Sequence, residues 1–140
     1  DALPISGRKG LIILTDAQDE GSNHSVQDAI LAAQQANAVV HVLLVADPQY
    51  AFSIGYIGRS IAREMATQTG GRVIAVRNNN DLDKAFDQIS QELRSQYVIA
   101  YYPTNTTANG AFRKIKVETT TQGLRVLTRQ GYYAPGRSVR

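Results

Sequence analysis

Apolar and polar positions along the first two thirds of the chain follow a repeating strand-then-helix pattern. Three short, nearly continuous apolar stretches are each followed by a longer stretch with apolar residues at helical spacing. The predicted strands are Leu11–Leu14, Val39–Val45 and Arg72–Val76, and their composition is typical of strands buried on both faces. Three successive strand–helix units predict a parallel sheet with right-handed crossovers.

The three predicted helices carry boundary signals. Ser25 is a suitable N-cap for the first helix, and Asp28 at its N3 position complements the positive helix start. The second helix contains Ile57–Ala66 and ends before Gly70. Asn80 is predicted to cap the third helix, which has the clearest apolar stripe in the sequence: Leu82, Ala85, Phe86, Ile89 and Leu93.

After Ser95 the pattern changes to strands and turns. The predicted strands are Tyr97–Tyr102, Arg113–Glu118 and Leu124–Thr128, which we interpret as an antiparallel β-meander. The sequence thus predicts an α/β domain over residues 1–96, with an antiparallel β extension over residues 97–140 packed on it.

Composition narrows the class of protein. A chain of 140 residues, 43% hydrophobic, fits one domain with a sizeable core. It has no cysteine, which excludes disulfides and thiolate chemistry, and no apolar run of about eighteen residues, so we expect no transmembrane segment. The chain begins Asp1-Ala2 without a methionine, and we therefore expect it to be part of a longer protein.

Charge is unevenly distributed. Residues 1–60 carry three basic and six acidic side chains, whereas residues 61–140 carry twelve basic and six acidic ones. The basic C-terminal section is consistent either with an acidic partner or with an ordinary solvated face. It contains Arg113, Lys114, Lys116, Arg125, Arg129, Arg137 and Arg140 against Glu118 alone.

The stretch LIILTDAQDEGS, residues 11–22, is the main candidate for chemistry. Asp16 lies where the first strand ends, the edge at which open α/β sheets place their binding crevices, so it is our candidate metal ligand. Asp19, Glu20 and Ser22 form the candidate binding loop around it. The spacing of these acids lacks the alternating oxygen ligands of a calcium loop, and the alternative is that the side chains hydrogen-bond loop amides.

Other catalytic patterns are missing from the sequence. It contains no GxSxG, GxGxxG or GxxxxGK[ST] motif. His24 lies in a loop, and His41 interrupts a predicted buried strand and is interpreted as a core residue. Tyrosines beside the C-terminal basic residues could stack on nucleic-acid bases, but packing across a sheet explains them better, so we expect no nucleic-acid binding.

Several segments, taken in order, resemble the von Willebrand factor A (VWFA) domain, and more closely the VWFA-related proteins abundant in Acidobacteria. They are GRKGLIILTDAQDEGSNHSVQDAILAAQQANAVVHVLLV, then TGGRVIAVRNNNDLDKAFDQISQELRSQYVIAYYPTN, then FRKIKV, GLRV and RQGYYAP, together spanning about Gly7 to Pro135. The resemblance implies the C-terminal half of a Rossmann-like fold that binds protein ligands through a metal ion.

In that family an Asp-x-Ser-x-Ser motif, a threonine and the Asp of a Thr-Asp-Gly motif hold the cation. Only that last Asp maps here, onto Asp16, and Ala17 replaces the glycine. No Asp-x-Ser-x-Ser motif occurs in the sequence, so no cofactor is expected for this chain, and Mg²⁺ or Ca²⁺ is implied for the full-length parent. The resemblance also puts the first strand in mid-sheet, which would leave it here as an exposed apolar edge.

The functional expectation is a non-enzymatic protein-binding, adhesion or scaffold module with an incomplete metal site. Its expected partner is another protein or the missing N-terminal half of the domain. From the resemblance we expect an extracytoplasmic location: secreted, periplasmic or in the cell envelope. One alternative is a metal-independent accessory subunit of a larger, membrane-associated complex. Another is a hydrolase that uses the loop carboxylates.

Overall fold

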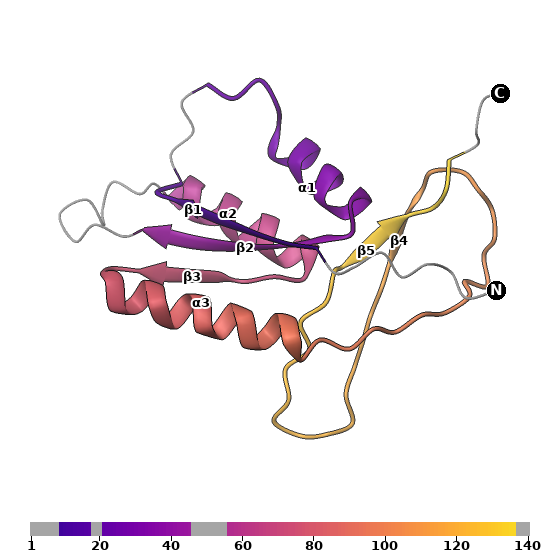
Figure 1. Cartoon of the computed structure of the whole chain (residues 1–140). Coiled ribbons are helices and arrows are strands. Elements are labelled where there is room, and N and C mark those ends of the chain that lie inside the picture. The colour runs from indigo at the N-terminus through magenta and orange to yellow at the C-terminus, as the bar shows by residue number, and fades with distance from the viewer. Residues whose placement is uncertain (1–8, 18–20, 46–55, 137–140) are drawn as a thin grey trace.

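The computed structural model describes residues 9–17, 21–45 and 56–136. It contains a three-stranded parallel sheet in which the strands are adjacent in chain order (Figure 1). This confirms the predicted α/β fold class. The strands are β1 (Lys9–Thr15), β2 (Ala38–Val45) and β3 (Val73–Val76), and the helices are α1 (Val26–Gln35), α2 (Tyr56–Thr69) and α3 (Asn79–Arg94).

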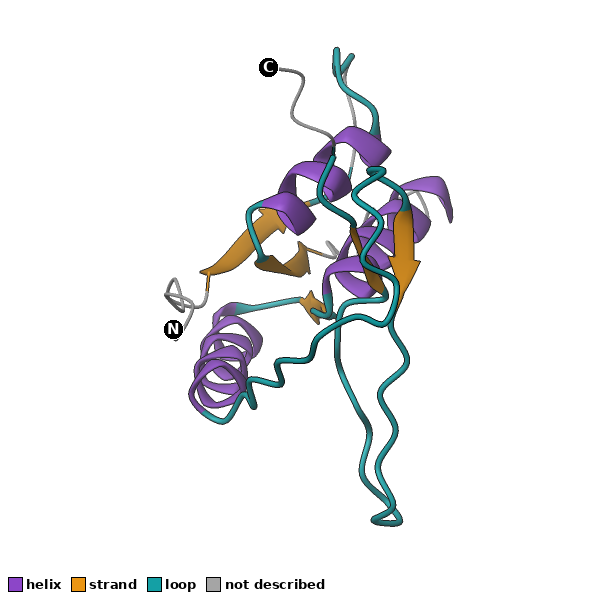
Figure 2. Ribbon diagram, turned by 90° about the vertical axis from the view of Figure 1, so that its right-hand side faces the viewer, coloured by secondary structure: helices purple, strands orange, loops and turns teal. Residues whose placement is uncertain are grey.

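The helices cover both faces of the sheet (Figure 2). On one face Val40 and Val42 of β2 pack with Ala62 and Ala66 of α2, and Ala33 of α1 joins this cluster. On the other face Leu43 of β2 and Val76 of β3 pack with Ala85 and Ile89 of α3. Alternate residues of β2 therefore enter two separate cores, as the twofold periodicity of a strand requires.

Thr69, the last residue of α2, completes the hydrogen bonding of β2. β3 is shorter than β2, and its paired residues begin opposite Val42. The buried N–H of Val40 donates instead to the Thr69 hydroxyl oxygen at 3.0 Å, and that hydroxyl lies 2.9 Å from the carbonyl of Met65. The hydroxyl thus supplies an acceptor where the strand ladder ends.

The helix starts agree with the sequence in one case and differ in another. Ser25 caps α1 as predicted, because its hydroxyl accepts from the N–H of Asp28 at 3.1 Å while the Asp28 carboxylate accepts from the N–H of Ser25 at 2.9 Å. The predicted cap Asn80 is wrong. Asn78 caps α3, since its side chain accepts from the N–H of Asp81 at 2.9 Å.

β1 is an edge strand, and its predicted burial on both faces is wrong. Within the part of the chain that the structure describes, β1 pairs only with β2. Ile12 and Ile13 pack against the two cores, but Leu11 is 48% and Leu14 is 56% exposed. The helices that cover β2 and β3 do not reach across the outer side of β1.

Two apolar positions predicted to lie on inner helix faces are also exposed. Ile57 in the first turn of α2 is 73% exposed, and Phe86 of α3 is 44% exposed. Within the described ranges the sheet is three strands wide, so the flanks of the helices extend beyond the surface that it offers. The central members of the α3 stripe, Ala85 and Ile89, are buried as predicted.

The C-terminal extension forms one short hairpin. β4 (Phe112–Lys114) pairs antiparallel with β5 (Gly131–Tyr133), and a long loop between them extends away from the sheet (Figure 1). The predicted strands Tyr97–Tyr102 and Leu124–Thr128 are wrong, and Arg113–Glu118 is a strand only at its start. Residues 97–102 are exposed and have no strand partner among the described residues, so β-forming side chains alone do not make them strands.

The extension contacts the α/β part near the C-terminal ends of α1 and α2. Arg129 donates to the side-chain carbonyl of Asn37 at 2.8 Å, and the backbone N–H of Gln130 donates to the carbonyl of Gln68 at 3.4 Å. Gly70 has a φ of 89°, and a Cβ placed there would lie 2.7 Å from the backbone nitrogen of Arg129. Gly70 thus permits a close approach of the two parts.

Candidate functional site

The candidate metal ligand, Asp16, lies directly after β1 and is exposed. The turn that follows is fixed by Thr15, whose hydroxyl oxygen accepts from the N–H of Ala17 at 2.9 Å. Ala17 has a φ of 60°, in the left-handed region that favours glycine. The chain therefore turns sharply at the carboxyl end of β1, as expected for a binding loop of an open α/β sheet.

α2 approaches this turn very closely. A Cβ added to Gly58 would lie 2.2 Å from the carbonyl oxygen of Ala17 and 3.0 Å from its Cβ. Only glycine at position 58 allows this contact. The first turn of α2 thus packs on the backbone beside Asp16 and fixes the course of the chain there.

The structure describes one of the other three candidate binding residues. Ser22 is exposed on the segment that leads to α1, while Asp19 and Glu20 lie outside the described residues. In the described ranges, no three His, Cys, Asp or Glu side chains are grouped so that they could hold a metal ion. The described residues therefore do not by themselves make up a cation site of His, Cys, Asp and Glu side chains.

Two acidic side chains at helix starts, Asp28 in α1 and Asp81 in α3, have structural roles. Asp81 accepts from the N–H of Arg77 at 3.3 Å and occupies the first turn of α3. Hydrogen bonds from the Ser25 hydroxyl, then from its N–H, hold the pKa of Asp28 below its usual value. Both carboxylates stabilise helix starts through local bonds and dipole interaction.

His41 lies in the core beneath α3, as interpreted from the sequence, whereas His24 is exposed before α1. The side chain of His41 is 2% exposed, and its ring nitrogens have no hydrogen-bond partner in the described part of the molecule. Burial lowers its pKa, Glu92 acts in the opposite direction, and Arg72 lowers it further. A side chain so enclosed is unsuited to proton exchange with a substrate.

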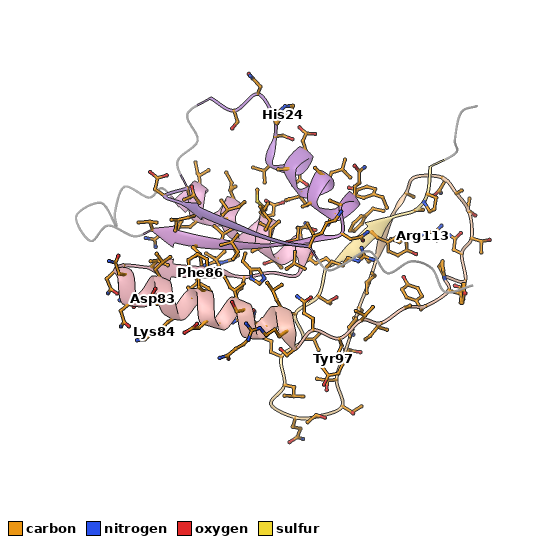
Figure 3. All side chains as sticks on the ribbon, viewed as in Figure 1. His24, Asp83, Lys84, Phe86, Tyr97 and Arg113 are labelled. Carbon is orange, nitrogen blue, oxygen red and sulfur yellow. The ribbon has the colours of Figure 1, made fainter. Side chains whose placement is uncertain are left out.

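A second cluster, which the sequence did not assign to a site, lies on the hairpin. The guanidinium carbons of Arg113 and Arg129 are 5.9 and 5.8 Å from the ring centroid of Tyr132. Tyr101 contacts the same ring edge-on at 6.5 Å. Figure 3 labels Arg113 at the end of the molecule opposite Asp83 and Lys84 of α3. In the sequence, this cluster was indicated only by the excess of basic over acidic residues in the C-terminal section, beside several tyrosines.

Comparisons with known proteins give the fold and little more. No protein-family model matches the chain, and no curated protein does. The chain is similar to a crystal structure described as an uncharacterized membrane spanning protein from Vibrio fischeri, with 18% sequence identity and a TM-score of 0.51. The match covers 61% of this chain and 47% of that one, so it spans about half the length of the similar structure. At this identity the likeness shows the fold alone.

None of the helices in the described ranges is long and apolar enough to cross a membrane.

Proposed function

We propose that this chain is a non-enzymatic protein-binding or scaffold module that docks through the outer edge of β1. The observation that carries the proposal is the exposure of Leu11 and Leu14, 48% and 56%, on a strand that pairs on one side only among the described residues. An edge strand presents unpaired N–H and C=O groups, and apolar side chains on such an edge favour pairing with another strand.

The positions of the exposed side chains support a strand as the occupant. Leu11 lies on the face covered by α1 and α2, and Leu14 lies on the face covered by α3, because successive residues alternate between faces. A strand added beside β1 would contact both side chains at once and would continue both cores. The partner is therefore a protein segment that supplies a strand, either from the parent protein or from another subunit.

The VWFA resemblance supports the same proposal, because it implies further strands beyond β1 in a complete domain. Under this proposal the module is extracytoplasmic and belongs to a VWFA-related protein. Docking through β1 uses apolar contacts and backbone hydrogen bonds, so it does not require a metal ion. Adhesion through a cation at Asp16 would need ligands from the parent protein.

The experiment is a concentration series of the 140-residue chain in analytical ultracentrifugation. An uncovered apolar edge predicts self-association of the isolated chain. Leu14→Lys should weaken it by about tenfold, because a charge on an edge strand opposes pairing. Leu124→Lys is the matched control: Leu124 is 65% exposed on the hairpin loop, far from β1 in sequence, and should change association less than about twofold.

The proposal fails if the chain alone is a monodisperse monomer that unfolds cooperatively, or if both variants weaken association equally. Chelation by EDTA and Asp16→Ala separate the two forms of binding. Metal-independent docking predicts no effect of either, whereas cation-dependent adhesion predicts that both abolish association.

A further inference from the structure

A groove lies between the C-terminal end of α1 and the hairpin. Its volume is about 300 Å³, and its lining is formed by Gln34, Gln35, Asn37, Arg129, Tyr132 and Tyr133. One wall comes from the last turn of α1 and from Asn37, which follows it. The other wall comes from Arg129 and from Tyr132 and Tyr133 of β5. Among the residues that the structure describes, no acidic side chain contributes to this lining.

Arg129 in the groove and Arg113, whose guanidinium contacts the same Tyr132 ring, are held by neutral groups. Arg129 donates to the Asn37 side-chain carbonyl at 2.8 Å, and Arg113 donates to the backbone carbonyls of Asn105 and Thr107, the latter at 2.7 Å. No ion pair of Arg129 or Arg113 with a carboxylate is seen within the described residues, in contrast to Arg72 with Glu92 and Lys116 with Glu118. Both guanidinium groups are thus held by neutral acceptors in the part of the chain that the structure describes.

Asn37 and Tyr132 also have polar hydrogens that can donate to a bound group. Because Asn37 accepts from Arg129 with its carbonyl, its amide N–H₂ group is left to donate. The phenol oxygen of Tyr132 accepts from Tyr101 and from Arg113, and these bonds lower the Tyr132 pKa while the Tyr101 pKa is raised. The O–H of Tyr132 can therefore donate to a further acceptor.

We propose that this groove binds a carboxylate of an acidic peptide segment, with Arg129 as the principal donor and Tyr132 and Asn37 as supporting donors. A planar guanidinium matches the two oxygens of a carboxylate, and such charge-assisted bonds are the strongest hydrogen bonds in proteins. This inference rests on the proposed function, since the carboxylate belongs to a protein partner, but it assigns a surface separate from β1.

The adjacent helix end reduces the attraction of Arg129 for an anion without cancelling it. The groove lies at the C-terminal end of α1, where the helix carries a partial negative charge of about half an elementary charge, and α1 has no basic residue in its last turn. The full positive charge of Arg129 exceeds this partial charge, so the groove still attracts a carboxylate.

The test measures binding of a fluorescein-labelled, N-acetylated hexapeptide of alternating Asp and Glu to the full chain by fluorescence anisotropy. Arg129→Gln should weaken binding by about tenfold, and Tyr132→Phe by a smaller factor. Arg125→Gln is the matched control, because it removes the same charge from an exposed position outside the groove and should change binding less than about twofold. Arg129→Lys keeps the charge but lacks the planar guanidinium that matches both carboxylate oxygens, so it should also weaken binding.

The proposal is overturned if Arg125→Gln and Arg129→Gln weaken binding equally, because attraction would then be a general charge effect. It is also overturned if the Asn and Gln version of the peptide binds equally well. Loss of thermal stability in Arg129→Gln with unchanged peptide binding would make Arg129 a structural residue only.

Leu14→Lys separates this inference from the proposed function. That variant should keep full peptide affinity even when self-association through β1 is lost. Tyr132→Phe is the second variant should Arg129→Gln fail to fold, because it removes one hydroxyl and leaves the charges in place.

Discussion

Ala17 has an unfavourable backbone conformation immediately after the candidate metal ligand. Its φ of 60° costs an L-residue about 1–2 kcal/mol relative to the usual regions. A glycine would adopt this φ without that cost, because it has no Cβ. The turn is kept in spite of the alanine, because Thr15 bonds the Ala17 N–H and Gly58 packs on its carbonyl.

Ala17→Gly should therefore stabilise the chain. Relief of the left-handed strain outweighs the extra freedom that glycine gives the unfolded chain, and the expected net gain is about 0.5–1 kcal/mol. Urea denaturation followed by circular dichroism measures it. Ala32→Gly, on an exposed position inside α1, is the same chemical change without strain to relieve and should cost about 1 kcal/mol. Destabilisation by both variants would contradict the positive φ at Ala17.

Among the secondary-structure elements, the sequence predicted those whose signals are local. The three helices follow from apolar spacing and from caps such as Ser25, and the strands of the parallel sheet follow from short apolar runs. The prediction failed for Tyr97–Tyr102, because strand formation depends on a partner strand that no local pattern specifies. The apolar run of β1 indicated burial on both faces, whereas the exposure of Leu14 was expected only from the resemblance, because it depends on which strands lie beside β1.

The packing of α3 on β2 makes the stability of the chain depend on pH through His41. Its pKa is lowered in the folded state, so below about 6.5, its value when exposed, the unfolded chain binds a proton that the folded chain resists. The contribution of His41 to the free energy of unfolding is fully present above that pH. It falls as pH decreases, by at most about 1.4 kcal/mol per pH unit for one proton.

His41→Leu should reduce the decrease in the free energy of unfolding at acidic pH. Between about pH 7 and 5.5 the parent chain should lose roughly 1 kcal/mol more than the variant, measured by urea denaturation at each pH. Equal slopes in the parent and in His41→Leu would show that another group causes the acid loss.

At the scale of the whole molecule, the candidate surfaces are assembled from distant parts of the chain. Arg129 and Asn37 are 92 residues apart in sequence, so no motif could join them before the fold was known. The carboxyl edge of the sheet was found from sequence because strand order alone places Asp16 there. The groove required the hairpin to dock on α1 and α2, and the sequence offered only its basic charge as a signal.

The docking of the hairpin should make the extension part of the same cooperative unit as the sheet. Gly70 combines a φ of 89° with backbone contact to Thr128 and Arg129, whereas Gly123 has a φ of 81° with nothing within 4 Å of an added Cβ. Gly70→Ala and Gly123→Ala therefore share the cost of the left-handed conformation. Only Gly70→Ala also forces the two parts of the molecule apart, which should add about 1–3 kcal/mol of destabilisation.

Urea unfolding followed by two probes tests this expectation. Circular dichroism reports on the helices, and tyrosine fluorescence reports mainly on the extension, since five of the seven tyrosines lie after residue 96. Gly70→Ala should move both transitions together to lower urea, because a cooperative unit unfolds in a single step. A shift in the fluorescence transition with the circular dichroism transition unchanged would mean that the hairpin unfolds separately, and the groove beside Arg129 would then be lost before the sheet.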